Sequence, residues 1–446
     1  MTGSTAGHAN IFIGEARRKA HAGAIASAGR HGPKIIAIVL AAVFYNAVLA
    51  FANAHGISIN RAMVAITEGI VLAAALMLVV SSGRRSIDSA GFALFAFFLG
   101  NALLVSLLSG ALFVDMARNG AIIVLFMLLG SRIDERALKA CFLIVSLLIA
   151  ACLVLELVSV KSYAALLQPG TYFAQTRGIA LADIDELGLF RNAVWYEGRF
   201  AISSISNHRT ASLFLEQVSL ANFSTVLVIY LVALWKRIHF GVRVFYIGLI
   251  ALILLSNNTR AGLALAIGAP IVYWAAPRLS RYATLAVMPL ILVAGTIITY
   301  SLPPSKEDTF VGRVGLTIRS LADLDPMALI GAKAPTAIDF VDSGYTYLIY
   351  ATSLIGMLVM WLLFSLASGN RNVDQRRCGL MLSLFVFINL LIAGNAVFTI
   401  KIAALIWLLV GFLRADGAQV AADREQGGAR PLRDVNDPTG HRWAPV

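Results

Sequence analysis

The sequence predicts an all-α protein that crosses a membrane about twelve times and carries two long loops on one side. Three observations predict this class. The 446 residues are 59% hydrophobic and only 13% charged, with a mean hydropathy of +0.80. Apolar residues form continuous runs close to the ~20 residues that a helix needs to cross the hydrocarbon core. Lys and Arg gather in short connections between those runs.

These patterns exclude other classes of protein. A transmembrane β-barrel alternates apolar and polar residues, whereas the apolar runs here are continuous. The net charge of +12 does not indicate nucleic-acid binding, because the basic residues are not gathered on one polar face. Cys141, Cys152 and Cys378 lie in or beside apolar runs without metal-ligand spacing, so we expect buried thiols and no disulfide.

Each predicted span is an apolar run between polar or basic residues. Residues 1–33 form a basic segment before the first span, which is expected to stay as an uncleaved anchor. The membrane domain covers residues 34–413, and the Gly-, Pro- and charge-rich tail, residues 414–446, is expected to be disordered and cytoplasmic. The predicted spans are residues 35–53, 62–81, 90–110, 119–131, 140–158, 211–234, 243–257, 261–277, 283–300, 344–366, 378–394 and 396–413.

Basic residues in the short connections predict the orientation, because they are retained on the cytoplasmic side of the membrane, here expected to be a bacterial inner membrane. Every second connection is basic, and both termini are therefore expected inside. The parity of the spans then puts the two long loops, about residues 159–209 and 301–343, in the periplasm. The basic connections hold Arg84 and Arg85; Arg132, Arg136 and Lys139; Lys236, Arg237 and Arg243; Arg278 and Arg281; and Arg371, Arg376 and Arg377.

Ionisable residues inside the spans share a depth under this topology. Glu68, Glu156, Glu216, Arg260 and Lys401 all lie toward the outer ends of their helices. Any one of them could be an interfacial side chain that reaches for water. Their common depth instead favours a site near the outer surface, beneath the long loops, whereas transporters typically place such groups near the midplane.

The end of the first long loop carries a charged motif, Asn-His-Arg-Thr-Ala-Ser-Leu-Phe-Leu-Glu-Gln, at residues 207–217. If the chain is helical from Thr210 onward, Arg209 and Glu216 lie on one face, since seven residues are close to two turns. A cation and a carboxylate would then line one groove. The alternative is an ordinary ion pair at a helix start.

Two further motifs follow along the chain. Residues 255–264, Leu-Ser-Asn-Asn-Thr-Arg-Ala-Gly-Leu-Ala, form a polar turn around Arg260 that by itself is typical of a short loop. The second long loop contains Gly312 and Arg313 and then an expected amphipathic helix that Pro326 stops. The apolar positions of that helix, expected on the membrane or on the bundle, are Val314, Ile318 and Leu321.

In this order the motifs resemble the bacterial O-antigen and exopolysaccharide polymerases (Wzy type) and the related O-antigen ligases, which are lipid-linked glycosyltransferases similar to the GT-C type. The resemblance covers roughly residues 209–361, and the earlier spans match in topology only. Ligases carry a His near the start of the span after the second loop, where this chain has Asp342 and Ser343, which favours a polymerase. The matching positions are Arg209, Phe214 and Glu216; residues 256–260 with Gly262; Gly312, Arg313, Pro326 and Gly331; and Asp342, Tyr345 and Gly356.

The resemblance implies an enzyme that joins polyprenyl-diphosphate-linked oligosaccharide repeat units at the outer face of the inner membrane. Arginine suits the diphosphate leaving group, because its planar fork makes two contacts and stays charged. A carboxylate would accept the proton of the attacking hydroxyl. The expected catalytic residues are Glu216, Arg209, Asp342 and His208, and the expected substrate-binding residues are Arg260, Arg313, Arg319, Lys333 and Tyr345.

No metal and no cofactor are expected. Asp-x-Asp triplets at residues 183–185 and 323–325 are common by chance, and arginines can supply the same electrostatic stabilisation as an ion. Membrane lipid, a chain-length regulator and export proteins are the expected partners, and nucleic acid is not. The alternative functions are an O-antigen-type ligase, a polysaccharide flippase or exporter component, and a non-catalytic member of a secretion complex.

Overall fold

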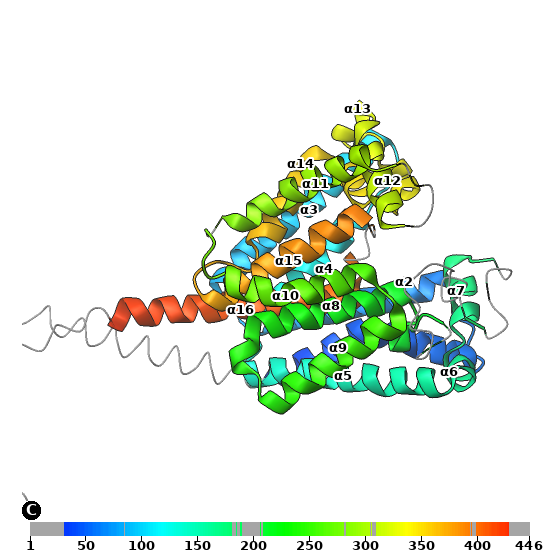
Figure 1. The fold of residues 1–446 in the computed structure, drawn as a ribbon, viewed down its shortest axis with the longest axis horizontal. Helices are drawn as coiled ribbons and strands as arrows, with labels where there is room; N and C mark the ends of the chain where they lie inside the picture. The colour runs from blue at the N-terminus through cyan, green and yellow to red at the C-terminus, as the bar shows by residue number, and fades with distance from the viewer. Residues whose placement is uncertain are drawn as a thin grey trace, which may run out of the picture.

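In the computed structural model the chain forms a bundle of helices (Figure 1). The structure describes residues 31–83, 85–180, 184, 188–189, 206, 208–280, 282–303, 305, 309–392, 394 and 398–427. Nine helices of this part of the chain are long and apolar enough to cross a membrane, so the protein is a multi-pass membrane protein. They are His31–Ala54, α2 (Arg61–Ser81), α3 (Ser86–Ser109), α5 (Glu135–Val158), α8 (Gln217–Leu234), α9 (Phe240–Asn257), α11 (Ala283–Ser301), α14 (Gly344–Leu366) and α15 (Val373–Ile392).

Three more helices occupy the remaining predicted segments: α4 (Asp115–Gly130), α10 (Arg260–Ala275) and α16 (Ile400–Gly427). A helix therefore lies at each of the twelve expected positions, while the number of membrane crossings stays a prediction. α4 and α16 pack closely, since a Cβ added to Gly130 or to Gly411 would clash with a backbone carbonyl of the facing helix. Small residues allow such close approach between membrane helices.

Two boundaries differ from the expectation. α16 continues as a helix through Gly427, so the first part of the tail that was expected to be disordered is helical. α8 begins at Gln217, whereas helix was expected from Thr210. The intervening residues form the 3-10 turn η3 (Ser212–Phe214), and Ser212 and Leu215 have φ of 48° and 62°. Arg209 and Glu216 therefore do not share a face of one helix.

A buried carboxylate explains the late start of α8. Glu156, on α5, is 1% exposed and accepts the backbone N–H of Ala211 at 3.0 Å and of Ser212 at 2.7 Å. The hydroxyl of Tyr163 donates to the Ser212 carbonyl at 2.9 Å. These backbone groups are satisfied by side chains in place of a helical ladder, which favours the non-helical turn.

Both long connections contain helices. The first holds α6 (Val160–Leu167) and α7 (Pro169–Arg177). The second holds α12 (Phe310–Ala322), α13 (Pro326–Leu329) and the 3-10 helix η5 (Ala334–Phe340). α12 is the expected amphipathic helix, although it ends at Ala322, before Pro326. Its apolar side chains were expected on the membrane or on the bundle, and they pack on the bundle. They are Val314, Ile318 and Leu321.

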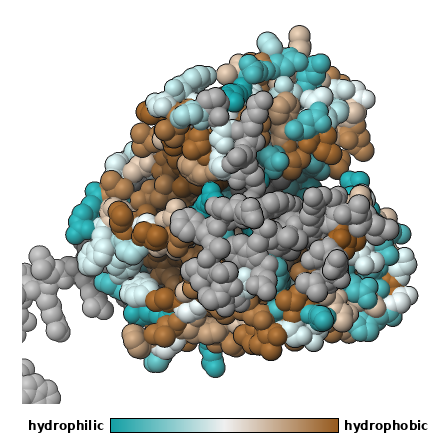
Figure 2. All heavy atoms as spheres, turned by 45° about the vertical axis from the view of Figure 1, so that its right-hand side comes forward, coloured by the Kyte–Doolittle hydropathy of each residue, from teal (hydrophilic) through white to brown (hydrophobic). Residues whose placement is uncertain are grey.

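The helices α6, α7, α12 and α13 lie toward the same end of the bundle, at the right of Figure 1. Both long connections thus meet at one end, as the parity of the predicted spans required. Figure 2 shows hydrophobic side chains over broad areas of the surface, as expected for helices that face lipid.

Two arginines at the other end of the bundle are paired with carboxylates. Arg132 is 1% exposed and lies 2.8 Å from Asp88. Arg237 lies within 3.2 Å of three carboxylates on three different helices or helix ends, those of Glu135, Asp374 and Asp416. These basic residues were expected to set the orientation, which stays a prediction; the structure shows that Arg132 and Arg237 join helices.

Candidate functional site

A cavity of about 280 Å³ lies where the two long connections meet the bundle. Its wall comes from the end of α7, the first turns of α8, α10 and α12, and the last turns of α15. Of the residues that sequence analysis selected, it brings together Arg209, Glu216, Arg260 and Arg313. We call it the cationic cavity.

Three helices of 13 to 18 residues begin at this cavity. The lining includes Gln217 and Val218 of α8, residues 259–262 around the start of α10, and Thr309, Phe310 and Arg313 around the start of α12. The first N–H groups of a helix have no partner within it, and the helix dipole makes that end positive. Three such ends around one space favour an anion.

The side chains add to the positive charge. Four arginines and one carboxylate line the cavity, which leaves three positive charges in excess among the described lining residues. The arginines come from four different parts of the chain: Arg177, Arg209, Arg260 and Arg313. Cations close together repel one another, so an arrangement of this kind is stabilised when an anion binds.

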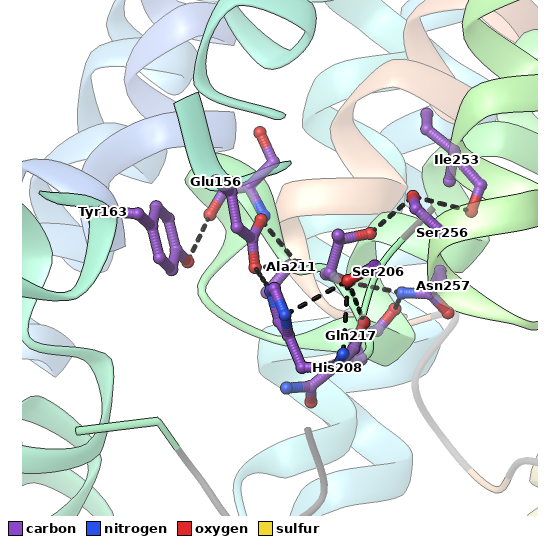
Figure 3. A network of polar contacts seen from close by, with 11 residues as sticks. Glu156, Tyr163, Ser206, His208, Ala211, Gln217, Ile253, Ser256 and Asn257 are labelled. Carbon is purple, nitrogen blue, oxygen red and sulfur yellow. Dashed lines mark hydrogen bonds and ion pairs between the residues drawn. The ribbon is translucent and has the colours of Figure 1, made fainter. Parts of the chain in front are cut away.

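Arg209 joins two of the sequence motifs. Its Nε donates to the Asn257 carbonyl at 3.0 Å and its Nη2 to Asn257 Oδ1 at 3.4 Å. The Asn257 amide in turn donates to the carbonyls of Thr210 at 2.6 Å and Gln217 at 2.8 Å. The turn before α10 is thereby attached to the chain that leads into α8 (Figure 3). These bonds fix the position of the Arg209 guanidinium at the cavity wall.

Glu216 lies between two cations. Its Oε1 is 2.9 Å from Arg177 Nη1, and its Oε2 is 3.3 Å from Lys401 Nζ and accepts from Ser219 Oγ at 2.8 Å. Lys401 is only 3% exposed and also donates to the Phe214 carbonyl at 3.2 Å. Burial disfavours the Arg177 cation, but the Glu216 carboxylate outweighs burial and raises the pKa of Arg177. The two cations stabilise the carboxylate form of Glu216 and make it a weak proton acceptor.

Two other embedded carboxylates have structural partners and do not line the cavity. Glu68 accepts from Arg118 Nη2 at 2.8 Å and from the Tyr45 hydroxyl at 3.2 Å. Glu156 holds the turn before α8, and Figure 3 shows His208 beside it. The His208 Nε2 lies 3.3 Å from Glu156 Oε1, and its Nδ1 lies 3.1 Å from Ser206 Oγ. His208 therefore belongs to this buried network and not to the described wall of the cationic cavity.

The remaining expected site residues are spread around the second loop. Arg313 lines the cavity, donates to the Ile392 carbonyl at 3.1 Å and has Asp342 at 3.8 Å. Asp342 itself has a side chain that is 72% exposed, outside the cavity wall. Three others do not line the cavity. Arg319 is exposed, and Lys333 lies 3.7 Å from Asp325. Tyr345 is buried, and its hydroxyl donates to the Phe387 carbonyl at 3.0 Å.

Sequence reasoning missed several lining residues. Arg177 was not distinguished from other basic residues, because nothing in its neighbours shows that α7 ends at the cavity. Asn222 and Thr225 on α8 and Asn389 on α15 line the deeper part. Polar residues inside apolar runs were an available signal for these three. Asn222 is buried, and its Nδ2 has no hydrogen-bond partner among the described residues.

The described residues hold no group of three or more His, Cys, Asp or Glu side chains that could bind a metal ion. Asp325 caps α13 by accepting the Met327 N–H at 2.8 Å. Asp183 and Asp185 of the other triplet lie outside the described residues. So do four other charged residues of the first long loop: Glu186, Arg191, Glu197 and Arg199. The three cysteines are buried and free, as predicted.

No protein-family model, no curated protein and no solved structure matches this chain. The resemblance to polysaccharide polymerases thus stands on the sequence motifs. Three arginines of those motifs, Arg209, Arg260 and Arg313, line the same cavity.

Proposed function

We propose that this protein is a polysaccharide polymerase, which joins polyprenyl-diphosphate-linked oligosaccharide repeat units at the outer face of a bacterial inner membrane. One observation carries the proposal: four arginines and three helix starts surround a single cavity that has one carboxylate among its described lining residues. A diphosphate is the doubly phosphorylated anion that such a wall would bind.

The reaction proposed here exchanges one bond at the anomeric carbon. A sugar hydroxyl of one repeat unit attacks the anomeric carbon of another, and the bond from that carbon to the diphosphate oxygen breaks. Arg209, Arg260 and Arg313 stabilise the negative charge that develops on the departing diphosphate, which typically lowers the barrier more than any other single contribution. Arginine can do this in two-contact geometry.

The proton of the attacking hydroxyl passes to Glu216, the carboxylate in the described wall. Arg177 and Lys401 weaken this base, but they also hold the carboxylate in one position. General-base catalysis typically contributes a factor of about 100 to 10,000. A weak base suits a reaction in which departure of the diphosphate, and not proton removal, is the difficult step.

The position of the cavity favours an enzyme over a flippase. The cavity opens where helices begin, at the end of the bundle that carries α7 and α12. A flippase or exporter needs a cationic path that continues through the midplane. A lipid-anchored substrate reaches the end of the bundle by diffusion in one leaflet.

The test is to label outward-facing lipid-linked repeat units in cells that carry Arg260→Gln. We expect single repeat units to accumulate at the outer face with loss of long polymer, while Arg136→Gln, an exposed arginine away from the cavity, leaves polymer unchanged. Single units trapped at the inner face would contradict the proposal and indicate a flippase. Normal polymer in the Arg260→Gln cells would contradict the assignment of the site.

A further inference from the structure

A second cavity, also of about 280 Å³, lies between the connection from α10 to α11 and the connection from α14 to α15. It shares no lining residue with the cationic cavity. Its wall combines a basic side chain, hydroxyl groups and apolar side chains. The residues that carry the argument are Leu279, Tyr282, Ser365, Leu366 and Arg376.

Arg376 is the charged residue among the described lining of this second cavity, and no carboxylate accompanies it there. Its Nη1 donates to the Pro277 carbonyl at 3.1 Å, but its Nε has no hydrogen-bond partner among the described residues. The hydroxyl of Ser365, which is 2% exposed, has none either. Buried donors without partners are costly, so two in one wall point to an acceptor that completes the site.

The surrounding charge selects the sign of that acceptor. Arg371 and Arg278 lie on the connections that form this cavity, and Arg414 donates to the Ala367 carbonyl at 3.1 Å. The acidic residue nearest to Arg376 in the sequence, Asp374, is paired with Arg237 at 2.9 Å. The field around the second cavity is therefore positive, and an anion is favoured.

The apolar residues at this cavity place it at a membrane surface. Tyr282 is exposed, and so are Leu279 and Leu366. Trp274, in the last turn of α10, is also exposed. Exposed Trp and Tyr at helix ends are typical of the interface between hydrocarbon and headgroups. An anion bound here would reach the site with its apolar part in the lipid.

We propose that the second cavity binds the phosphate of an anionic phospholipid. Arg376 and Ser365 donate to the phosphate oxygens, and the acyl chains pack against Leu279, Tyr282 and Leu366. Basic pockets between membrane helices bind lipid headgroups in this way. The site does not depend on the function of the cationic cavity, and it stabilises the connections that hold α10, α11, α14 and α15.

The experiment is native mass spectrometry of the purified full-length protein, titrated with phosphatidylglycerol or phosphatidylcholine. We expect a first phosphatidylglycerol to bind more tightly than phosphatidylcholine. Arg376→Gln should weaken its binding about tenfold, as loss of a hydrogen bond to a charged group does. Arg136→Gln is the matched control, because this exposed arginine lies at the start of α5, outside the cavity wall and away from its connections, and should change binding less than about twofold.

Three outcomes would overturn the proposal. Equal weakening by the two variants would mean that general surface charge attracts the lipid. Equal binding of phosphatidylcholine would remove the anion preference. Competition by glycerol phosphate at the same concentration would make a free phosphate ester the ligand. If Arg376→Gln does not fold, Ala283→Phe fills the cavity without changing charge and should also weaken binding about tenfold; unchanged binding would contradict the site.

Discussion

Two groups of arginines, one at each end of the bundle, differ in their surroundings. At one end Arg132 pairs with Asp88, and Arg237 contacts three carboxylates. At the other end four arginines share the cationic cavity with Glu216, whose carboxylate also contacts Lys401. Both ends are rich in arginine, so composition alone does not distinguish them. What distinguishes the second group is the cavity that its arginines line together.

We propose that this difference separates arginines that hold the fold from arginines that bind a ligand. A buried arginine with a carboxylate partner is part of the fold, and its removal leaves an uncompensated charge. An excess of cations around a cavity costs stability, because like charges repel. Such an excess persists where function requires it.

The largest effect on stability is expected for an arginine with a buried carboxylate partner. Arg132→Ala leaves the Asp88 carboxylate buried without its partner, which should destabilise the protein by about 3–5 kcal/mol. Arg260→Ala, in the cationic cavity, should cost less than about 0.5 kcal/mol because Arg260 is exposed. Unfolding of both purified variants in detergent measures the contrast. Equal destabilisation would remove the distinction between the two ends.

For activity, the largest effect is expected in the cationic cavity. Arg260→Lys keeps the charge but loses the two-contact fork, so polymer synthesis should fall by about 100-fold or more at unchanged expression. The matched control is Arg136→Lys, an exposed arginine outside the cavity, which should leave synthesis unchanged. Polymer length and yield in cells provide the measurement. Normal synthesis in Arg260→Lys cells would make Arg260 a boundary residue.

Much of the fold was accessible from the sequence, because membrane helices are marked by length and hydropathy. The exact residues at which helices begin were not accessible. The expected helix from Thr210 is replaced by a turn that Glu156 holds, and Glu156 lies 55 residues before Ala211 in the sequence. A local propensity argument does not include a partner that far away. The same limitation applies to His208, whose neighbour Glu156 was seen only as an embedded charge.

The candidate site was accessible in part. Arg209, Arg260 and Arg313 were selected from ordered motifs, and they line one cavity. The contact between Glu216 and Lys401 joins residues 185 positions apart and follows from the packing of α16 against α8. Tyr345 was also selected from the motifs, but its side chain is buried and its hydroxyl donates to the Phe387 carbonyl of α15. Motif order alone does not tell a packing residue from a lining residue.

The contact between Glu216 and Lys401 provides a smaller and sharper test. Glu216→Gln leaves the buried Lys401 without a carboxylate, and Lys401→Met leaves Glu216 with Arg177. The double variant should be more stable than the sum of the single effects predicts, by about 1–3 kcal/mol. Thermal unfolding of the four proteins completes the cycle. Additive effects would show that Glu216 and Lys401 do not interact.

The smallest effect is expected in the deeper part of the cavity. Asn222→Ala removes an amide whose Nδ2 has no partner among the described residues, so stability should stay within about 0.5 kcal/mol. Loss of a hydrogen bond to the substrate should lower polymer synthesis by about tenfold. Ser224→Ala, on the same helix but outside the cavity wall, is the control. Full activity in Asn222→Ala would exclude the deeper part from substrate binding.

We propose that the cationic cavity catalyses polymer formation from lipid-linked units. The direct measurement uses the purified protein in vesicles, with lipid-linked repeat units extracted from cells that lack the gene. The account predicts longer lipid-linked oligosaccharides and release of one polyprenyl diphosphate for each bond formed, both abolished in Arg260→Gln. Movement of intact single units across the vesicle membrane, without any longer product, would contradict it.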